Sequence, residues 1–481
     1  MKFNKFLIGA LTAGVVAFTT NSCRKIEEDG QIVYQNGGGN NGGTTPTENL
    51  TIGSSTSGFT EIKENLTLKS GKTYTLNGII FVKNGATLTI EPGTKIVGAN
   101  EKSGLVITRG AKIMAEGTVD SPIVFTSNKA VPKRGDWAGI ILLGKAPTNS
   151  NYNNQAGVGQ IEGVPVGSID DQLYGGTDTN DNSGILKYVR IEYAGYAFLP
   201  DKEINGLTFG GVGKGTTVDY VQVSYANDDS FEWFGGTVNC KHLIAYKGLD
   251  DDFDTDNGFS GNVQYGIGVR DPQVADISGS NGFESDNDAN GSTLAPQTAA
   301  VFSNMTMVGP IYNDADPATI NNLHQNGAQI RRNSSISIFN SIFMGYKDSG
   351  FYIDGTKGTS TDVNITAGNL VLQNNIIAGC PIPLRFSGVK DYAGYDLAKL
   401  TAYFNSNGNT ILTSAKGLMA GPWNPAGTTP NFSPSSNSPL LTGGVFTHTK
   451  LSNAFFDKVA YRGAVKDAND FWYTRWTNFN L

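Results

Sequence analysis

The side chains best suited to chemistry in this chain are carboxylates that recur beside phenylalanine. Four short segments begin with Phe and place an acid at the second or fourth position: Phe231-Glu-Trp-Phe, Phe253-Asp-Thr-Asp, Phe283-Glu-Ser-Asp and Phe351-Tyr-Ile-Asp. Alternate residues of a strand point to opposite faces, so the Phe side chains are expected inside and the acids outside. If the segments stack, one outward column holds Glu232, Asp254 and Glu284, and a second holds Asp256, Asp286 and Asp354.

Stacked carboxylates repel one another by about 3–4 kcal/mol per pair at an effective dielectric constant near 20. Such columns need solvent, a cation, raised pKa values or a basic partner. Two segments favour a cation, because they place acids at alternate positions around a Gly turn, and calcium takes hard oxygen ligands from such segments. The predicted calcium ligands are Asp252, Asp254, Asp256, Asp286, Asp288 and Asn290.

Neither segment is an EF-hand. The twelfth position, which would hold a bidentate Glu, is Val263 in the first segment and Gln297 in the second. The alternative interpretation is that Asp, Asn and Gly occur together because they form turns.

The same columns allow an enzyme. Glycoside hydrolysis needs two carboxylates about 5 Å or about 6.5–9.5 Å apart, and the candidates are Glu232, Asp254 and Glu284. A calcium-assisted polysaccharide lyase also needs a basic group, for which Arg270 and Arg331 are candidates. No Ser/His/Asp order, phosphate-binding loop or HExxH motif is present. We therefore predict a non-catalytic binding module for a glycan or partner protein, with a lyase or hydrolase as the alternative.

The predicted ligand contacts on this face are Glu232, Trp233 and Tyr352.

The elements that must position these residues repeat along the chain. Six β-rich stretches each close on Gly or Asn, at Gly195, Asn227, Gly248, Gly309, Gly345 and Gly379. The long step from Gly248 to Gly309 fits two coils, with Asn262 to Asp271 between them. A unit that recurs at this scale buries its apolar side only by stacking on its neighbours. The pattern predicts an all-β parallel solenoid over residues 50–450.

Stacking also predicts columns outside the acidic face. Asn304, Asn340 and Asn374 are equally spaced from their closing Gly residues and are expected to form a structural amide ladder. Tyr193, Tyr225 and Tyr246 are expected to form an aromatic stack, with core packing favoured over a sugar platform. Phe471, Trp472, Tyr473, Trp476 and Phe479 lie in residues 451–481, which are predicted to cap the solenoid, since an open end would recruit other chains.

The N-terminal sequence predicts that the protein is exported. A basic start, the apolar stretch from Phe6 to Phe18 and Cys23 indicate a secretory signal over residues 1–22 that resembles a bacterial lipoprotein signal, with Cys23 lipidated. Residues 23–49 are too polar and Gly-rich to pack and form a tether. The net charge of −7 argues against nucleic-acid binding.

Two longer resemblances support this organisation. The phrase EPGTKI followed by AEGTVDSPIVFTS resembles the opening coils of right-handed parallel β-helix proteins. The segments DWAGIILLGKAP, DNSGILKYVRIEYAG, INGLTFGGVG and DDSFEWFGGTVN, with the C-terminal YRGAVKDANDFWYTRWTNF, resemble a Bacteroidota family of β-helix lipoproteins. That resemblance implies an outer-membrane protein that faces the cell exterior, and an adhesin or companion of an outer-membrane receptor is a further alternative. It transfers no catalytic residue.

Overall fold

The computed structural model describes residues 49–54, 56, 58–199, 202–312, 315–388, 394–421 and 430–481. The predicted signal peptide, the predicted lipidation site Cys23 and nearly all of the predicted tether lie outside these residues. Within them, no helix is long and apolar enough to cross a membrane.

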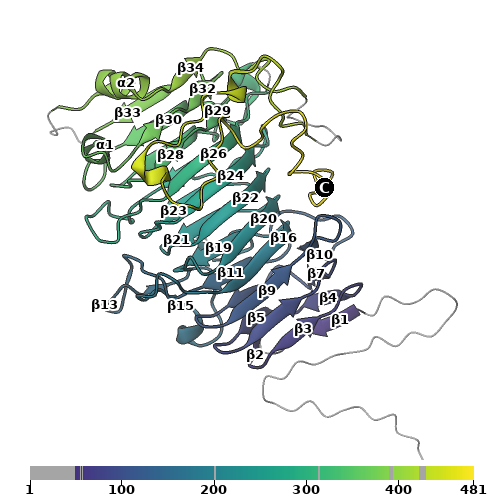
Figure 1. Ribbon diagram of the computed structural model, residues 1–481. Coiled ribbons are helices and arrows are strands. Elements are labelled where there is room, and N and C mark those ends of the chain that lie inside the picture. Colours follow the sequence, from purple (N-terminus) through teal and green to yellow (C-terminus); the bar gives the residue numbers. More distant parts are fainter. Residues whose placement is uncertain are drawn as a thin grey trace, which may run out of the picture.

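Almost all strands belong to two parallel sheets that wind together along one axis (Figure 1). The first sheet contains β1 (Asn49–Ile52), β3 (Leu66–Leu68), β4 (Thr73–Leu76), β6 (Thr87–Ile90), β7 (Lys95–Gly98), β9 (Lys112–Glu116), β10 (Ile123–Ser127), β16 (Gly184–Glu192), β20 (Thr217–Ser224), β22 (Asn239–Tyr246), β24 (Asn262–Val269), β26 (Val301–Val308), β28 (Ser337–Phe339), β29 (Ile342–Met344), β31 (Leu372–Gln373), β32 (Ile376–Ala378) and β34 (Thr410–Leu412). The second sheet contains β2 (Phe59–Ile62), β5 (Ile79–Val82), β8 (Gly104–Ile107), β11 (Gly139–Leu143), β19 (Leu207–Gly210), β21 (Phe231–Phe234), β23 (Phe253–Asp256), β25 (Phe283–Ser285), β27 (Asn326–Arg331), β30 (Ser349–Asp354) and β33 (Leu384–Ser387).

The predicted parallel β-helix is confirmed, and its coils lie in register. Phe231 pairs with Phe253, and Phe253 with Phe283. Their ring centroids are 5.5 Å and 5.2 Å apart, and all three side chains are fully buried. This interior column fixes which residues face outward, because neighbours in a strand alternate between the two faces. The long sequence step also holds two coils, since β24 lies where the Asn262 segment predicted a strand.

A column of left-handed residues marks a bend in the first sheet. Seven residues with positive φ occupy equivalent places in successive coils: Tyr188, Tyr220, His242, Tyr265, Asn304, Asn340 and Asn374. Asn tolerates this conformation better than other non-Gly residues, which explains its recurrence there. The predicted amide ladder differs in detail. Asn304 and Asn340 bond to Tyr461 and Val445 of the C-terminal segment.

The predicted tyrosine stack also differs in register. Tyr193 stacks on Tyr225 with centroids 5.5 Å apart and planes 20° apart. Tyr246 pairs with Ser224 instead, and its ring meets Tyr225 nearly edge-on, at 83°. The closing Gly248 comes one residue earlier in that coil, so counting back two residues from it reaches Tyr246 instead of Lys247, which occupies the column.

Between β11 and β16 the chain leaves the β-helix and folds over the outer side of the second sheet. This excursion contains β12 (Asn151–Tyr152), β13 (Gln155–Ala156), β14 (Gly159–Gln160), η1 (Ile169–Asp171) and β15 (Leu173–Tyr174). Ile161 and Val164 of the excursion pack with Ile141 and Leu143 of β11. A short hairpin of β17 (Ala197–Leu199) and β18 (Lys202–Glu203) follows β16. Both lie at the N-terminal side of the acidic face.

Helix α2 (Leu397–Ser406) packs against the C-terminal end of the β-helix. Its Phe404 is fully buried and meets Phe351 at 5.9 Å. The remaining short helices lie in connections: α1 (Asp362–Thr366), η3 (Pro317–Thr319), η4 (Pro439–Leu441) and η5 (Thr449–Leu451).

The aromatic-rich C-terminal segment packs along the first sheet rather than across the last coil, and Figure 1 shows it returning toward β20 and β24. Side-chain amides hold it by paired hydrogen bonds: Gln222 both donates to and accepts from the backbone of Asn478, at 2.8 Å each way. Gln264 does the same with Asp457. Trp476 meets Tyr188 and Tyr220 edge-on, at 6.0 Å each. The segment thus covers a flank that spans several coils.

Candidate functional site

The first acidic column exists as the sequence predicted, on the outward side of the second sheet. Glu232 pairs with Asp254, and Asp254 with Glu284. The next coil, β27, places Gln329 beside Glu284 and is followed by Tyr352 of β30. The column is therefore acidic over three coils, neutral over the next two and basic at Arg385 of β33.

The acids at the C-terminal side of this column have basic partners. Arg331 contacts Glu284 through Nη2, and its Nε lies 2.9 Å from Asp286 Oδ1. Arg332 Nη1 lies 2.6 Å from Asp286 Oδ2. These charge-assisted bonds neutralise the two carboxylates without a metal ion.

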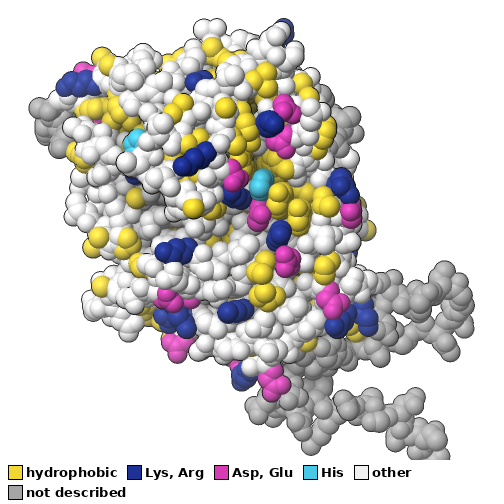
Figure 2. Space-filling model, in the orientation of Figure 1, with side chains coloured by type: hydrophobic (Ala, Val, Ile, Leu, Met, Phe, Trp, Pro, Cys, Tyr) yellow, Lys and Arg dark blue, Asp and Glu magenta, His cyan; other side chains and the backbone are white. Residues whose placement is uncertain are grey.

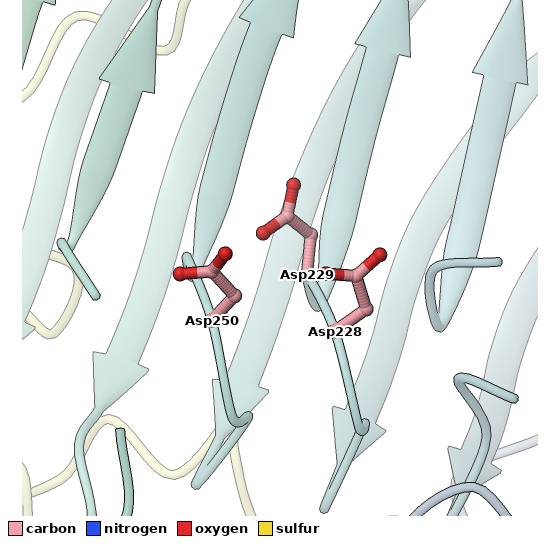
Figure 3. Close-up of side chains that lie close together, drawn as sticks. All are labelled: Asp228, Asp229 and Asp250. Carbon is pink, nitrogen blue, oxygen red and sulfur yellow. The ribbon is translucent and has the colours of Figure 1, made fainter. Parts of the chain in front are cut away.

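At the N-terminal side, carboxylates from adjacent turns converge. Oxygens of Asp228, Asp229 and Asp250 lie within 4.8 Å of one another, as do oxygens of Asp229, Glu232 and Asp254. Figure 3 shows Asp228 and Asp229 on one turn and Asp250 on the next, with their carboxylates gathered in the space between. Asp229 belongs to both groups. We call these five residues the carboxylate cluster.

Hydrogen bonds hold the cluster in place, but some of its side-chain oxygens have no hydrogen-bond partner. Asp229 Oδ1 accepts a bond of 2.8 Å from the backbone N–H of Asp251, and Asp250 Oδ2 accepts one of 2.8 Å from the Ser278 hydroxyl. Asn205 donates to Glu232 through its side-chain amide. Three buried oxygens have no hydrogen-bond partner: Asp250 Oδ1, Asp254 Oδ1 and Asn205 Oδ1. Buried acceptors without partners are costly, so these oxygens mark a place for a positively charged ligand.

Burial and mutual repulsion both act on the cluster. Burial raises the pKa of Asp229 well above its ordinary value, and the charges of Asp228 and Asp251 raise it further. Burial likewise raises the pKa of Glu232 and of Asp254, and each of them is raised again by another acid of the cluster. At neutral pH the five groups cannot all be ionised unless a cation balances their charge, and otherwise some of them stay protonated.

Comparisons with known proteins agree with the fold. Residues 60–418 match the family model described as a pectate-lyase-like β-helix domain. The chain belongs to this family. Among solved structures, the crystal structure of pectate lyase Pel9A is similar over 80% of this chain and 89% of that one, with 13% identity and a TM-score of 0.41. A search of the curated proteins finds no match.

In this pectate-lyase-like β-helix, the six predicted calcium ligands do not form one group. Asp254 joins the carboxylate cluster, whereas Asp286 is bound by the two arginines. Asp252 is fully buried at the start of β23, with one oxygen 3.0 Å from Nη1 of Arg270. Asp256 lies on the outward side, and burial together with the Asp286 charge raises its pKa to about 8.

The predicted loop from Asp286 to Asn290 forms a turn. Asp288 accepts hydrogen bonds from the backbone N–H of Asn290 at 2.8 Å and from the Ser292 hydroxyl at 2.6 Å. Asn290 is exposed. The turn-forming alternative accounts for this segment.

All three predicted ligand contacts are largely covered in the folded protein, and Glu232 is 7% exposed. Trp233 is fully buried because it alternates with Glu232 and stacks in the interior with Phe209 and Phe253. Tyr352 is on the outward side but 7% exposed, since the Arg385 guanidinium lies 4.3 Å from its ring centroid. Only Glu232 of the three belongs to the cluster.

Sequence reasoning missed Asp228, Asp229 and Asp250. These residues lie in the turns that precede β21 and β23, before the Phe residues that were used to align the coils. The repeated pairs Asp228-Asp229 and Asp250-Asp251, which begin one and two residues after the closing Asn227 and Gly248, were the signal that could have identified them.

Proposed function

We propose that this protein is an outer-membrane lipoprotein, displayed on the cell surface, that binds an acidic polysaccharide through calcium held by the carboxylate cluster. One observation supports it above the others. Five carboxylates from consecutive turns and strands converge around Asp229, and no Lys or Arg of the described residues forms an ion pair with Asp229, Glu232, Asp250 or Asp254.

The donor set fits calcium. Calcium takes six to eight oxygen ligands in flexible geometry, and carboxylates on neighbouring turns offer more ligand oxygens than the strict octahedron of magnesium requires. The unpartnered oxygens of Asp250 and Asp254 would contribute, with Asp229 between them. When bound, the ion would offset the repulsion within the cluster and leave positions for ligand oxygens.

A carboxylated glycan suits the rest of this face. Membership of the pectate-lyase-like family supports a polysaccharide ligand, and sugar carboxylates are hard oxygen donors for the same ion. Farther along, a hollow of about 120 Å³ is lined by Arg331, Arg332, Lys357, Asp354 and Thr356, and its basic side chains can donate to another carboxylate of a long chain. Figure 2 shows that acidic and basic side chains are interspersed on the face turned to the viewer.

Binding without cleavage is proposed because the candidate catalytic groups are engaged. Arg270 is fully buried and bound to Asp252. Glu284 and Asp286 raise the pKa of Arg331 against the opposing effect of burial, so Arg331 stays protonated and is unsuited to act as a base. Glu232 is 7% exposed and bonded to Asn205, which leaves little room for a sugar between it and Asp254.

A polysaccharide lyase is the second candidate, and family membership is the observation that favours it. The two functions differ in their products. A lyase generates unsaturated ends that absorb in the ultraviolet, whereas a binding module leaves the polymer intact.

The test uses the full-length protein and polygalacturonate as the probe, with dextran as a neutral control polymer. We expect polygalacturonate to bind in calcium, to be released by EDTA and to show no increase in ultraviolet absorbance. Binding that is unaffected by EDTA would exclude the calcium bridge. New absorbance that requires Asp254 would establish the lyase instead. A Cys23→Ser variant is expected to leave the membrane fraction, and its retention there would exclude the lipid anchor.

A further inference from the structure

A hollow of about 590 Å³ opens where β16 and β20 end. Its walls include Val131, Pro132 and Arg134 from the loop after β10, and Tyr193 and Tyr225 from the residues that follow β16 and β20. None of these residues belongs to the carboxylate cluster. The hollow combines an apolar rim, two stacked aromatic rings, the cations Lys133 and Arg134, and the C-terminal residue Leu481.

The positive charge of Arg134 has little to balance it. Arg134 donates through Nη2 to the backbone carbonyl of Lys247 at 2.6 Å, and its guanidinium carbon lies 4.9 Å from the centroid of the Tyr225 ring. Its Nε is buried and has no hydrogen-bond partner. Among the described residues, no carboxylate lies within ion-pair distance of Arg134. Buried charges are ordinarily paired, so this guanidinium is an exception.

A second positive charge lies near the first. The backbone carbonyl of Lys247 accepts the bond from Arg134, and the Lys247 Nζ lies 5.2 Å from the centroid of the Tyr246 ring. Lys247 likewise has no acid within ion-pair distance in the part of the chain that the structure describes. Burial lowers the pKa of both groups, and the charge of Asp271 only partly opposes it. An anion in the hollow would lower the cost of keeping both side chains charged.

The walls define the rest of the ligand. Tyr193 and Tyr225 stack nearly parallel, and Val131 is 74% exposed beside them. An inorganic ion would gain nothing from these surfaces, whereas a ring or an apolar body would bury them.

We propose that this hollow is a second ligand site, which binds a small organic anion with a carboxylate or phosphate group on a ring-shaped or apolar body. Arg134 binds the anionic group, and Tyr193, Tyr225, Val131 and Pro132 contact the body. The site is independent of the calcium-dependent function proposed for the other face.

The experiment is calorimetric titration of the full-length protein in EDTA, which removes calcium from the other face. The probes are benzoate, phenyl phosphate, inorganic phosphate and benzyl alcohol. We expect benzoate or phenyl phosphate to bind, with the stronger of the two identifying the preferred anion. Inorganic phosphate lacks the body and benzyl alcohol lacks the charge, so each should bind at least about tenfold more weakly.

Two variants test the assignment. Arg134→Gln should weaken binding of the preferred probe by about tenfold or more, because the charge-assisted contact is lost. Tyr225→Asn should also weaken it, and Asn tolerates the positive φ of 55° at this position, so the backbone need not change. The matched control is Arg109→Gln, because Arg109 also donates to a backbone carbonyl, that of Gly175, outside the hollow. Failure of wild type to bind either aromatic anion at about 5 mM, or equal binding by Arg134→Gln, would overturn the proposal.

Discussion

Two groups of carboxylates on the same outward face differ in how their charge is balanced. Glu284 and Asp286 contact Arg331 and Arg332. The carboxylate cluster, one coil away, includes Asp229 and Asp254, which form no ion pair among the described residues. Burial raises the pKa of both, and it also raises the pKa of Glu284, where the charge of Arg331 opposes the rise. The first group is balanced in part by its own arginines, whereas the second needs protons or a cation to balance its charge.

The difference comes from a single coil. Strand β27 carries Gln329 beside Glu284, and it carries Arg331 opposite Asp354 and in contact with Asp286. No coil next to β21 supplies a base in the same way, because β19 presents Thr208 and β23 presents Asp254. A stacked fold can therefore alternate between self-neutralised and ion-requiring segments by changing one or two residues per coil.

The largest effect is expected from Asp229→Asn. Asp229 belongs to both carboxylate groups, so its loss should weaken calcium binding by about 100-fold or more, measured by calorimetry. The Asn oxygen can still accept the hydrogen bond from Asp251. Because one repelling charge is removed, the variant should also melt at a higher temperature than wild type in EDTA.

Matched variants in the other group sharpen this prediction. Asp286→Asn and Asp288→Asn should change calcium affinity by less than about twofold, since arginines and the local turn already occupy those carboxylates. If either variant abolishes calcium binding while Asp229→Asn does not, the site lies in the Asp286 loop and the contrast between the two groups fails.

The fold could be predicted because its determinants repeat. The Phe column and the alternation of acids beside it follow from residue spacing alone, and the register bears this out. Strand β27 was missed because NGAQIR has neither the Phe nor the acid that defined the pattern. Phe351 was therefore placed directly after Phe283, although Ala328 lies between them in the column.

The site was harder to predict than the coils. Arg331 neutralises Glu284 and Asp286 from the missed coil, so the sequence suggested a calcium loop where the structure has ion pairs. Asp228 and Asp250 lie in turns, which have no fixed alternation, and only their stacking brings them together. The path of the C-terminal segment depends on Gln222 and Gln264, whose buried amides no sequence pattern singles out.

An intermediate effect is expected from Arg331→Gln. The substitution leaves Asp286 with Arg332 alone and leaves Glu284 without an ion pair among the described residues. These side chains are partly exposed, so the loss should be about 2 kcal/mol in the free energy of unfolding, less than for a fully buried pair. Urea denaturation measures it, with Arg385→Gln as a control that removes an exposed arginine 3.8 Å from Asp348. Added calcium should restore part of the lost free energy of unfolding only if Glu284 and Asp286, freed from Arg331, bind a second calcium ion.

The smallest expected effect is on the pH dependence of stability, which distinguishes the two groups of carboxylates. Burial raises the pKa of Asp256 to about 8 from 3.8, and raises that of Asp229 and Asp254 well above 3.8. Between pH 4 and pH 8, roughly, the folded chain binds more protons than the unfolded chain, so the free energy of unfolding falls as pH rises. In EDTA the Tm should fall by about 2–4 °C between pH 5 and pH 8.

Calcium should remove most of that decrease, because the ion takes the place of the protons. The decrease should also be smaller in Asp229→Asn, which has one fewer acid to ionise, and unchanged in Asp288→Asn. A Tm in EDTA that rises from pH 5 to pH 8 would mean that the cluster ionises freely in the folded protein. The two groups of acids would then be balanced alike, and the need for a cation at Asp229 would disappear.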